Sequence, residues 1–271
     1  MTDWATILDE MASSAQKEIG KLKGTAEAGF TLGRGAGGDI TRRIDRVAED
    51  AVIQVLRKRD IGCRVVSEEY GELTIGDDRE GFRVIIDSID GTTNAIRDIP
   101  FYCTSLAVSN GGNLRDVFAG LVIDQYSGDR YVASKGHGAY HSGKRMEPSQ
   151  VGDMTEALIG IDLSGVSLRV ARELSQFISK TRHTRHLGAA ALEVCMVAEG
   201  RLDAYVDMRN KLRVTDIAAA QLILTEAGGV IVALDGSSLD STLSLKDRLS
   251  FVAAGKEELC SKILGSVLKR G

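Results

Sequence analysis

The sequence has no hydrophobic run that approaches the length of a membrane span, and no signal peptide is visible at its start. We therefore expect a cytoplasmic protein that does not contact a membrane. Proline is also scarce, with 2 prolines against 30 glycines. Glycine should therefore punctuate the loops, which suits tight turns and close approach of the backbone to a ligand. The sequence contains no internal repeat and no low-complexity segment.

Cysteine spacing and net charge exclude further classes of protein. The four cysteines lie in separate apolar runs without C-x-x-C spacing, at Cys63, Cys103, Cys195 and Cys260. This predicts buried, reduced thiols and excludes a disulfide framework or a zinc site. The formal net charge of −4 argues against a surface that binds nucleic acid.

A glycine-rich stretch contains a literal G-x-G-x-x-G pattern at Gly33, Gly35 and Gly38. The pattern signals dinucleotide binding only when it follows a buried strand in a βαβ unit. Here a helix and a polar, glycine-rich segment precede it, so we reject that interpretation. A mobile loop is the better prediction for this stretch.

Apolar periodicity predicts two helices, near residues 3–22 and from Asp39 to about Arg59. After Pro100, apolar runs alternate with turn signals as far as a hairpin turn at residues 141–144. These features predict a largely antiparallel sheet on which the two helices pack. Residues 70–81 are polar and should form a loop.

From about residue 150, strands and helices alternate, which predicts a layered α/β arrangement. We therefore expect an α/β protein with two parts: an α+β lobe over residues 1–149 and an α/β lobe over residues 150–271. In the second lobe we expect short strands at 184–187 and 204–206, helices at 189–199 and from Asp216, and a closing helix at 257–269.

The segment 87–94, D-S-I-D-G-T-T-N, follows an apolar run with the composition of a buried strand. Its two acids, Asp87 and Asp90, would repel each other there unless a proton or a cation neutralised them. Hard oxygen donors favour Mg²⁺ or Mn²⁺ over zinc. The following N–H groups could bind a phosphate. Taken alone, the D-x-x-D spacing more often indicates an acidic turn that caps a helix.

Together with Ser67-Glu68-Glu69 and Thr215-Asp216-Ile217-Ala218-Ala219, this segment resembles the signature of the inositol monophosphatase and fructose-1,6-bisphosphatase superfamily. The resemblance covers nearly the whole chain and implies a layered α-β-α-β-α sugar-phosphatase fold. Relatives carry tryptophan before the last acid, where this chain has Thr215. In this departure the chain resembles the archaeal-type branch, whose members often act on both inositol and fructose phosphates.

The resemblance implies a site with two or three Mg²⁺ ions, for which Mn²⁺ could substitute. The implied metal ligands are Glu68, Asp87, Asp90, Asp216 and the carbonyl of Ile89. Thr92 would orient a metal-activated water, and Asp45 would hold the Thr92 hydroxyl. Without the resemblance, a single helical acid such as Asp45 is more often a solvated surface residue.

The same resemblance implies a set of substrate contacts. The phosphate would lie on the N–H groups of Asp90, Gly91 and Thr92, and a polyol hydroxyl would meet Asp207. Gly188, Ala189 and Ala190 open a helix and could offer N–H groups to a substrate oxygen, although close helix packing explains small residues equally well. Arg185 and Arg209 are our candidates for binding a second phosphate. A solvated basic loop remains an equal alternative.

These features imply a Mg²⁺-dependent phosphate monoesterase that acts on inositol 1-phosphate, fructose 1,6-bisphosphate or both, in carbohydrate metabolism. Two alternatives remain: a 3′-phosphoadenosine 5′-phosphate phosphatase of the same superfamily, and a weakly catalytic member with a binding or regulatory role. The intact acids argue against a dead enzyme. Since relatives are commonly dimers, we expect a homodimer.

Overall fold

The computed structural model describes residues 2–267. Its helices are α1 (Trp4–Leu22), α2 (Arg43–Lys58), α3 (Thr92–Ile96), α4 (Leu168–Ile178), α5 (Ala190–Ala198), α6 (Val214–Ala227) and α7 (Glu257–Val267). Short 3₁₀ turns lie at Ala26–Gly29 and Leu114–Asp116. No helix within the described residues is long and apolar enough to cross a membrane.

The strands form three sheets. A two-stranded hairpin consists of β1 (Thr31–Arg34) and β2 (Ile40–Arg42). The large sheet contains β3 (Cys63–Ser67), β4 (Gly71–Ile75), β5 (Arg83–Asp90), β6 (Cys103–Ser109), β7 (Val117–Asp124), β8 (Arg130–Ser134), β9 (Ala139–His141) and β10 (Lys144–Arg145). The small sheet contains β11 (Leu158–Ile161), β12 (His183–Arg185), β13 (Ala204–Leu212), β14 (Val230–Ala233) and β15 (Leu249–Ala254).

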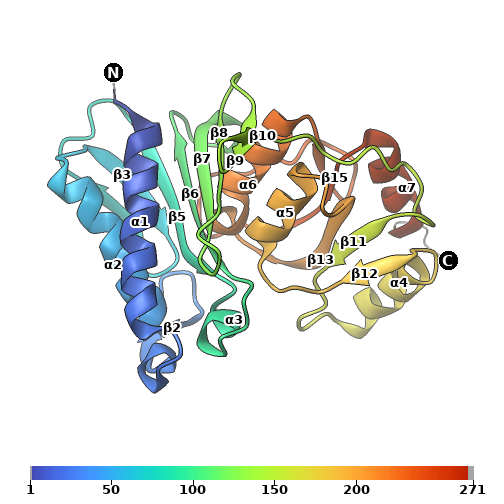
Figure 1. Ribbon diagram of the computed structural model, residues 1–271, viewed down its shortest axis with the longest axis horizontal. Coiled ribbons are helices and arrows are strands. Elements are labelled where there is room, and N and C mark those ends of the chain that lie inside the picture. The colour runs from blue at the N-terminus through green and yellow to red at the C-terminus, as the bar shows by residue number, and fades with distance from the viewer. Residues whose placement is uncertain (1, 268–271) are drawn as a thin grey trace.

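The elements stack in five layers (Figure 1). Helices α1 and α2 cover one face of the large sheet, and α5 and α6 cover the other. The small sheet packs on the far side of α5 and α6, and α4 and α7 cover its outer face. This order is the α-β-α-β-α arrangement that the resemblance implied.

Apolar spacing explains these layers. The buried side chains of α1 include Trp4, Ile7, Met11 and Ile19, which recur at helical spacing on the side that faces the sheet. Helices α5 and α6 differ because they lie between two sheets: α6 buries residues around most of its circumference, as its alanine-rich sequence permits. One hydrophobic cluster therefore combines residues from both halves of the chain. The division at residue 149 stays a proposal.

Strand pairing sets the position of the acidic residues. The large sheet has the order β10-β9-β8-β7-β6-β5-β3-β4 and is antiparallel except where β3 pairs with β5 in parallel. Ser67 at the end of β3 lies beside Ile86 of β5. Since parallel strands end at the same edge of a sheet, Glu68 and Asp87 emerge together there.

The structure corrects two predicted loops. The glycine-rich stretch contains the hairpin β1–β2, and the segment 70–81 contains the edge strand β4. All four residues of β1 are exposed, and β4 pairs only with β3. Strand β1 has no alternating apolar face, so its sequence carried no strand signal. In β4, exposed Glu72 and Thr74 alternate with Leu73 and Ile75, and this short signal was overlooked.

Several predicted boundaries also move. The second helix begins at Arg43 and not at Asp39, because residues 40–42 pair with β1. Strand β13 runs on to Leu212, and α6 starts at Val214. The predicted strand at 184–187 lies at 183–185, and the last residues predicted for the closing helix, 268–269, fall outside the described residues. The prediction of buried, unpaired cysteines is confirmed.

Candidate active site

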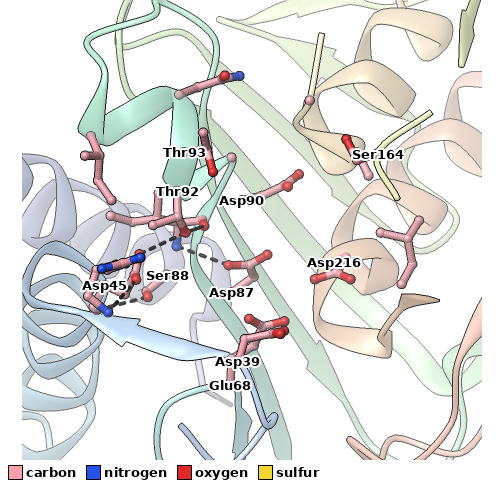
Figure 2. A pocket seen from close by; sticks show the side chains of 18 of the residues that line it. Asp39, Asp45, Glu68, Asp87, Ser88, Asp90, Thr92, Thr93, Ser164 and Asp216 are labelled. Carbon is pink, nitrogen blue, oxygen red and sulfur yellow. Dashed lines mark hydrogen bonds between the residues drawn. The ribbon is translucent and has the colours of Figure 1, made fainter. Parts of the chain in front are cut away.

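A cavity of about 860 Å³ lies at the junction between the two halves of the chain. Its wall combines the hairpin β1–β2, the turn after β3, the end of β5 with α3, and residues that flank the strands of the small sheet. Figure 2 shows carboxylates from these separate elements directed toward a common space. Both halves of the chain therefore build the cavity.

Three carboxylates converge in it. Oxygen atoms of Glu68, Asp87 and Asp216 all lie within 4.8 Å of one another. Glu68 follows β3, Asp87 lies near the end of β5, and Asp216 occupies the first turn of α6, where it accepts a hydrogen bond of 2.7 Å from the N–H of Arg213. The fold thus brings together residues that are 148 positions apart, since 216 − 68 = 148.

Burial and mutual repulsion make this cluster unfavourable as bare anions. Burial, followed by the negative charge of Glu68, raises the pKa of Asp87 and of Asp216 well above the ordinary value. A divalent cation would offset both effects, and an all-oxygen donor set is the one that Mg²⁺ or Mn²⁺ prefers. The residues present therefore fit a hard divalent cation.

Asp90 connects this cluster to the second half of the chain. Its Oδ2 accepts a hydrogen bond of 2.7 Å from the N–H of Ala191 in the first turn of α5. Burial raises the pKa of Asp90 to about 7, although the N–H of Ala191 acts in the opposite direction. Asp90 is thus held across the junction between the large sheet and α5.

Thr92 and Asp45 form a hydrogen-bonded pair on the opposite wall (Figure 2). The Thr92 hydroxyl can donate to Asp45 Oδ1 at 3.0 Å or to the carbonyl of Ile89 at 3.1 Å. Asp45 Oδ2 accepts from the N–H of Arg42 at 3.1 Å, and burial raises the pKa of Asp45 to about 7. With its proton engaged in this way, the Thr92 oxygen can accept a hydrogen bond from a water in the cavity.

Sequence reasoning missed the residue that supports the turn after β3. Glu49 lies one helical turn after Asp45 on the same buried face of α2. It accepts hydrogen bonds from the Ser67 hydroxyl and from the N–H groups of Glu69 and Tyr70. Glu49 therefore holds the Ser67 side chain before Glu68 and the backbone of Glu69 and Tyr70 after it. The i, i+4 spacing from Asp45 was the available signal.

Arg213, three residues before Asp216, was not among the predicted site residues. In the structure its guanidinium pairs with Glu68 at 3.2 Å and with Asp39, and it donates to the carbonyl of Gly37 at 2.6 Å. The side chain is only 10% exposed. Arg213 thus lies beside the acidic cluster and is not available to a substrate as a free cation.

The predicted substrate contacts divide into two groups. Those that line the cavity are Asp90, Gly91, Thr92, Gly188, Ala190 and Arg209, whereas Arg185, Ala189 and Asp207 do not line it. Arg185 is exposed on the edge strand β12, and Ala189 is buried before α5. The proposed role of Arg185 in binding a second phosphate therefore has no support from its position.

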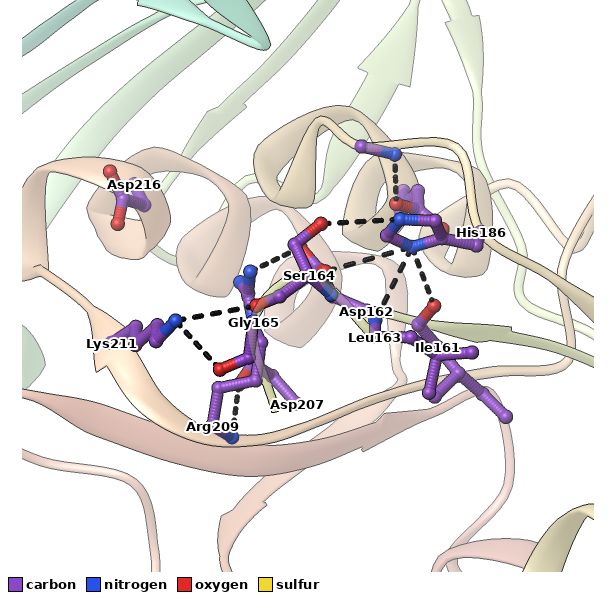
Figure 3. Close-up of polar contacts among 12 residues, drawn as sticks. Ile161, Asp162, Leu163, Ser164, Gly165, His186, Asp207, Arg209, Lys211 and Asp216 are labelled. Carbon is purple, nitrogen blue, oxygen red and sulfur yellow. Dashed lines mark hydrogen bonds and ion pairs between the residues drawn. The ribbon is translucent and has the colours of Figure 1, made fainter. Parts of the chain in front are cut away.

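Arg209 is already paired with two carboxylates (Figure 3). Its guanidinium contacts Asp162 at 2.7 Å and Asp207 at 2.5 Å, and its side chain is 9% exposed. Asp207 is fully buried, so its carboxylate meets Arg209 and not a hydroxyl in the cavity. Sequence reasoning missed Asp162, whose only signal was its position after strand β11.

Comparisons with known proteins find relatives over nearly the whole chain. The inositol monophosphatase family matches residues 4–268. A relative from Methanothermobacter thermautotrophicus, named fructose-1,6-bisphosphatase/inositol-1-monophosphatase, is 38% identical over 96% of this chain and 95% of its own length.

Two further comparisons extend the picture. A bifunctional NADP phosphatase/NAD kinase from Methanocaldococcus jannaschii is 32% identical over 92% of this chain but only 47% of its own length. A solved structure from Pyrococcus horikoshii, described as a hypothetical protein with similarities to inositol-1 monophosphatase, has a TM-score of 0.83 and 32% identity. It covers 98% of each chain.

Proposed function

This chain belongs to the inositol monophosphatase family and is a phosphatase, and we propose that it hydrolyses inositol 1-phosphate and fructose 1,6-bisphosphate in a Mg²⁺-dependent reaction. The observation that carries the proposal is the convergence of Glu68, Asp87 and Asp216 in the cavity that also contains the Thr92–Asp45 pair. The two substrates are those in the printed name of the Methanothermobacter relative.

Each residue has a distinct task in this proposal. Glu68, Asp87 and Asp216, with Asp90 and the Ile89 carbonyl, would hold the cations. When bound, Mg²⁺ ions stabilise negative charge on phosphoryl oxygens and lower the pKa of water. Thr92 would accept a hydrogen bond from the attacking water and keep it aimed at phosphorus, because Asp45 fixes the rotamer of its hydroxyl.

The phosphate would be positioned by the backbone at the start of α3. Gly91 precedes that helix with φ of +89°, which turns the chain sharply after Asp90. We propose that the N–H groups of Gly91 and Thr92 donate to phosphate oxygens. For the organic part of the substrate, Gly188 and Ala190 line the wall that belongs to the second half of the chain.

A second candidate is hydrolysis of a nucleotide phosphate such as the 2′-phosphate of NADP. The M. jannaschii relative carries this activity in its name, and the chain spans about half the length of that protein. A cavity of about 860 Å³ is near the upper end of the range for small-molecule sites, and it is roomy for a monosaccharide bisphosphate. Another nucleotide substrate of this kind is 3′-phosphoadenosine 5′-phosphate, which the sequence analysis left as an alternative.

The test measures phosphate release from inositol 1-phosphate, fructose 1,6-bisphosphate, NADP and 3′-phosphoadenosine 5′-phosphate. The wild type is assayed with Mg²⁺ and with Mg²⁺ plus EDTA, and the Asp87→Asn variant is assayed with Mg²⁺. We expect turnover of inositol 1-phosphate and fructose 1,6-bisphosphate, lost with EDTA and reduced by at least about 10²-fold in the variant. The metal-free variant should be no less stable than the wild type, because asparagine is isosteric and removes one charge from the cluster.

Asp235→Asn, on an exposed turn, is the matched control and should retain full activity. Faster turnover of NADP than of both sugar phosphates would replace the first candidate with the second. Metal-independent turnover of any substrate would contradict the proposed chemistry.

A further inference from the structure

Arg213 contacts two parts of the molecule at once. It lies between β13 and α6, in the body of the protein, and its guanidinium reaches the turn of the hairpin β1–β2. There it donates to the Gly37 carbonyl at 2.6 Å and pairs with Asp39. On its other side it contacts Glu68 Oε1 at 3.2 Å. Its charge therefore lies at the edge of the carboxylate cluster.

The contact with Glu68 has an electrostatic consequence. Glu68 is one of the three carboxylates whose oxygens converge within 4.8 Å. A guanidinium at this distance neutralises part of the charge that a divalent cation would otherwise meet, and it repels that cation. Arg213 and a cation thus compete for the same carboxylate, and each must weaken the binding of the other.

The contact with the hairpin has a mechanical consequence. Within residues 2–267 the hairpin pairs with no other strand, and β1 is fully exposed. Its turn is held to the body by a few hydrogen bonds: the N–H of Gly37 donates to the Glu68 carbonyl at 2.8 Å, and the N–H of Ala36 donates to that of Glu69 at 3.4 Å. Arg213 adds contacts from the second half of the chain, so it ties the turn to the part of the protein that carries Asp216.

We infer that Arg213 is a positioning residue that acts as the resident counter-ion of Glu68 and anchors the hairpin β1–β2 over the cavity. Loss of its charge should raise the affinity of the cluster for a divalent cation and, independently, release the turn around Gly37. Only the counter-ion role rests on the proposed cation site. The anchoring role depends on the contacts of Arg213 with Gly37 and Asp39, which need no cation.

The test compares Arg213→Met, which keeps the length of the side chain but removes its charge, with Arg213→Lys, which keeps the charge. Calorimetric titration of the metal-free proteins with Mn²⁺ measures the first effect. Limited trypsin digestion measures the second, because Arg34 lies in the hairpin and cleavage after it gives a fragment that begins at residue 35. Arg64→Met, which removes an arginine paired with Asp78 outside the cavity wall, is the matched control.

We expect Arg213→Met to bind Mn²⁺ at least about fivefold more tightly than the wild type. Its cleavage after Arg34 should be several-fold faster. Arg213→Lys and Arg64→Met should bind Mn²⁺ like the wild type, and Arg64→Met should also be cleaved like it.

Unchanged or weaker Mn²⁺ binding by Arg213→Met would overturn the counter-ion role. Equal cleavage of all four proteins after Arg34 would overturn the anchoring role. A wild type that binds no Mn²⁺ would refute the cation site itself and with it the counter-ion role, and the digestion would still decide whether Arg213 anchors the hairpin.

Discussion

Glu193 in α5 is fully buried, yet it belongs to none of the proposed catalytic groups. Its Oε2 accepts a hydrogen bond of 3.2 Å from the N–H of Gly188, and its Oε1 has no hydrogen-bond partner among the described residues. Burial raises the pKa of Glu193 to about 8, from an ordinary value of 4.5. The side chain is therefore protonated at neutral pH and braces the loop before α5 as a neutral acid.

This assignment predicts how stability depends on pH. The unfolded chain releases the Glu193 proton near pH 4.5, whereas the native state keeps it up to about pH 8. The native state thus binds more protons in that window, and the free energy of unfolding falls as the pH rises through it. Because glutamine resembles the neutral acid, Glu193→Gln should match the wild type near pH 4.5 and exceed its stability by about 2–5 kcal/mol at pH 8.

Urea denaturation of the metal-free proteins at several pH values between 4.5 and 8 measures this difference. Glu147→Gln, at an exposed position, is the control and should follow the wild type throughout. A constant offset between Glu193→Gln and the wild type at every pH would rule out a neutral Glu193.

Residue types alone indicated only part of the site. Asp87 and Asp90 after an apolar run suggested a cation or an acidic helix cap, and the structure places both at the end of β5, with Asp87 buried. The other site residues came from the family resemblance. The partners of the arginines were not predictable in this way. Arg209 is neutralised by Asp162, and Arg213 by Glu68 and Asp39, and these pairings depend on strand positions that no local sequence pattern encodes.

At the scale of elements, the junction between β5 and α3 depends on one glycine. Gly91 has φ of +89°, and a Cβ there would lie 3.2 Å from the carbonyl oxygens of Gly188 and Phe101. An alanine would therefore be both strained and crowded by backbone atoms that cannot rotate away. Relief of the contact would shift the N–H groups that are proposed to bind phosphate.

We predict that Gly91→Ala loses about 1–2 kcal/mol of stability from backbone strain and, in addition, most of its phosphatase activity. Gly143 is the matched control, because its φ of +83° imposes the same strain while no atom lies within 4 Å of the added Cβ. Thermal denaturation should therefore show a loss for both variants, whereas phosphate release should fall only for Gly91→Ala. Full activity in Gly91→Ala would show that this turn does not position the substrate.

The elements themselves were predictable in proportion to their burial. Helix α1 buries one face on the large sheet, and strands β5 and β6 are covered by helices on both faces, so their apolar composition was visible in the sequence. The hairpin β1–β2 was taken for a loop because its strands are largely exposed and are held by backbone pairing and by Arg213. Exposed strands of this kind leave no periodic signal.

At the scale of the whole molecule, the position of Asp216 could not be derived from local pattern. Its carboxylate reaches Glu68 and Asp87 only because α6 lies between the two sheets, and sequence reasoning obtained that placement from the family resemblance. The homodimer likewise stays a prediction. The layered fold is confirmed. The alternation of strands and helices predicted the layers of the second half, and the resemblance implied the full order.

The contact between α6 and the large sheet depends on Gly120 in β7. A Cβ at this position would lie 3.1 Å from the Cα and 3.2 Å from the carbonyl oxygen of Ala219 in α6. Replacement of glycine by alanine at a compatible site usually stabilises a protein by about 0.4–1 kcal/mol, because it restricts the unfolded chain. Here the added methyl group meets backbone, so α6 must move away from the sheet.

We therefore predict that Gly120→Ala reverses the usual sign and destabilises the protein by about 1–2 kcal/mol. Since α6 carries Asp216, the shift should also weaken Mn²⁺ binding several-fold. Gly112→Ala is the matched control: its Cβ would lie 3.5 Å from the nearest atom, an ordinary contact with the flexible Arg83 side chain. Urea denaturation and Mn²⁺ titration of both variants measure the two effects. If Gly120→Ala were destabilised while Mn²⁺ affinity stayed unchanged, Asp216 would not be positioned by the packing of α6 on this sheet.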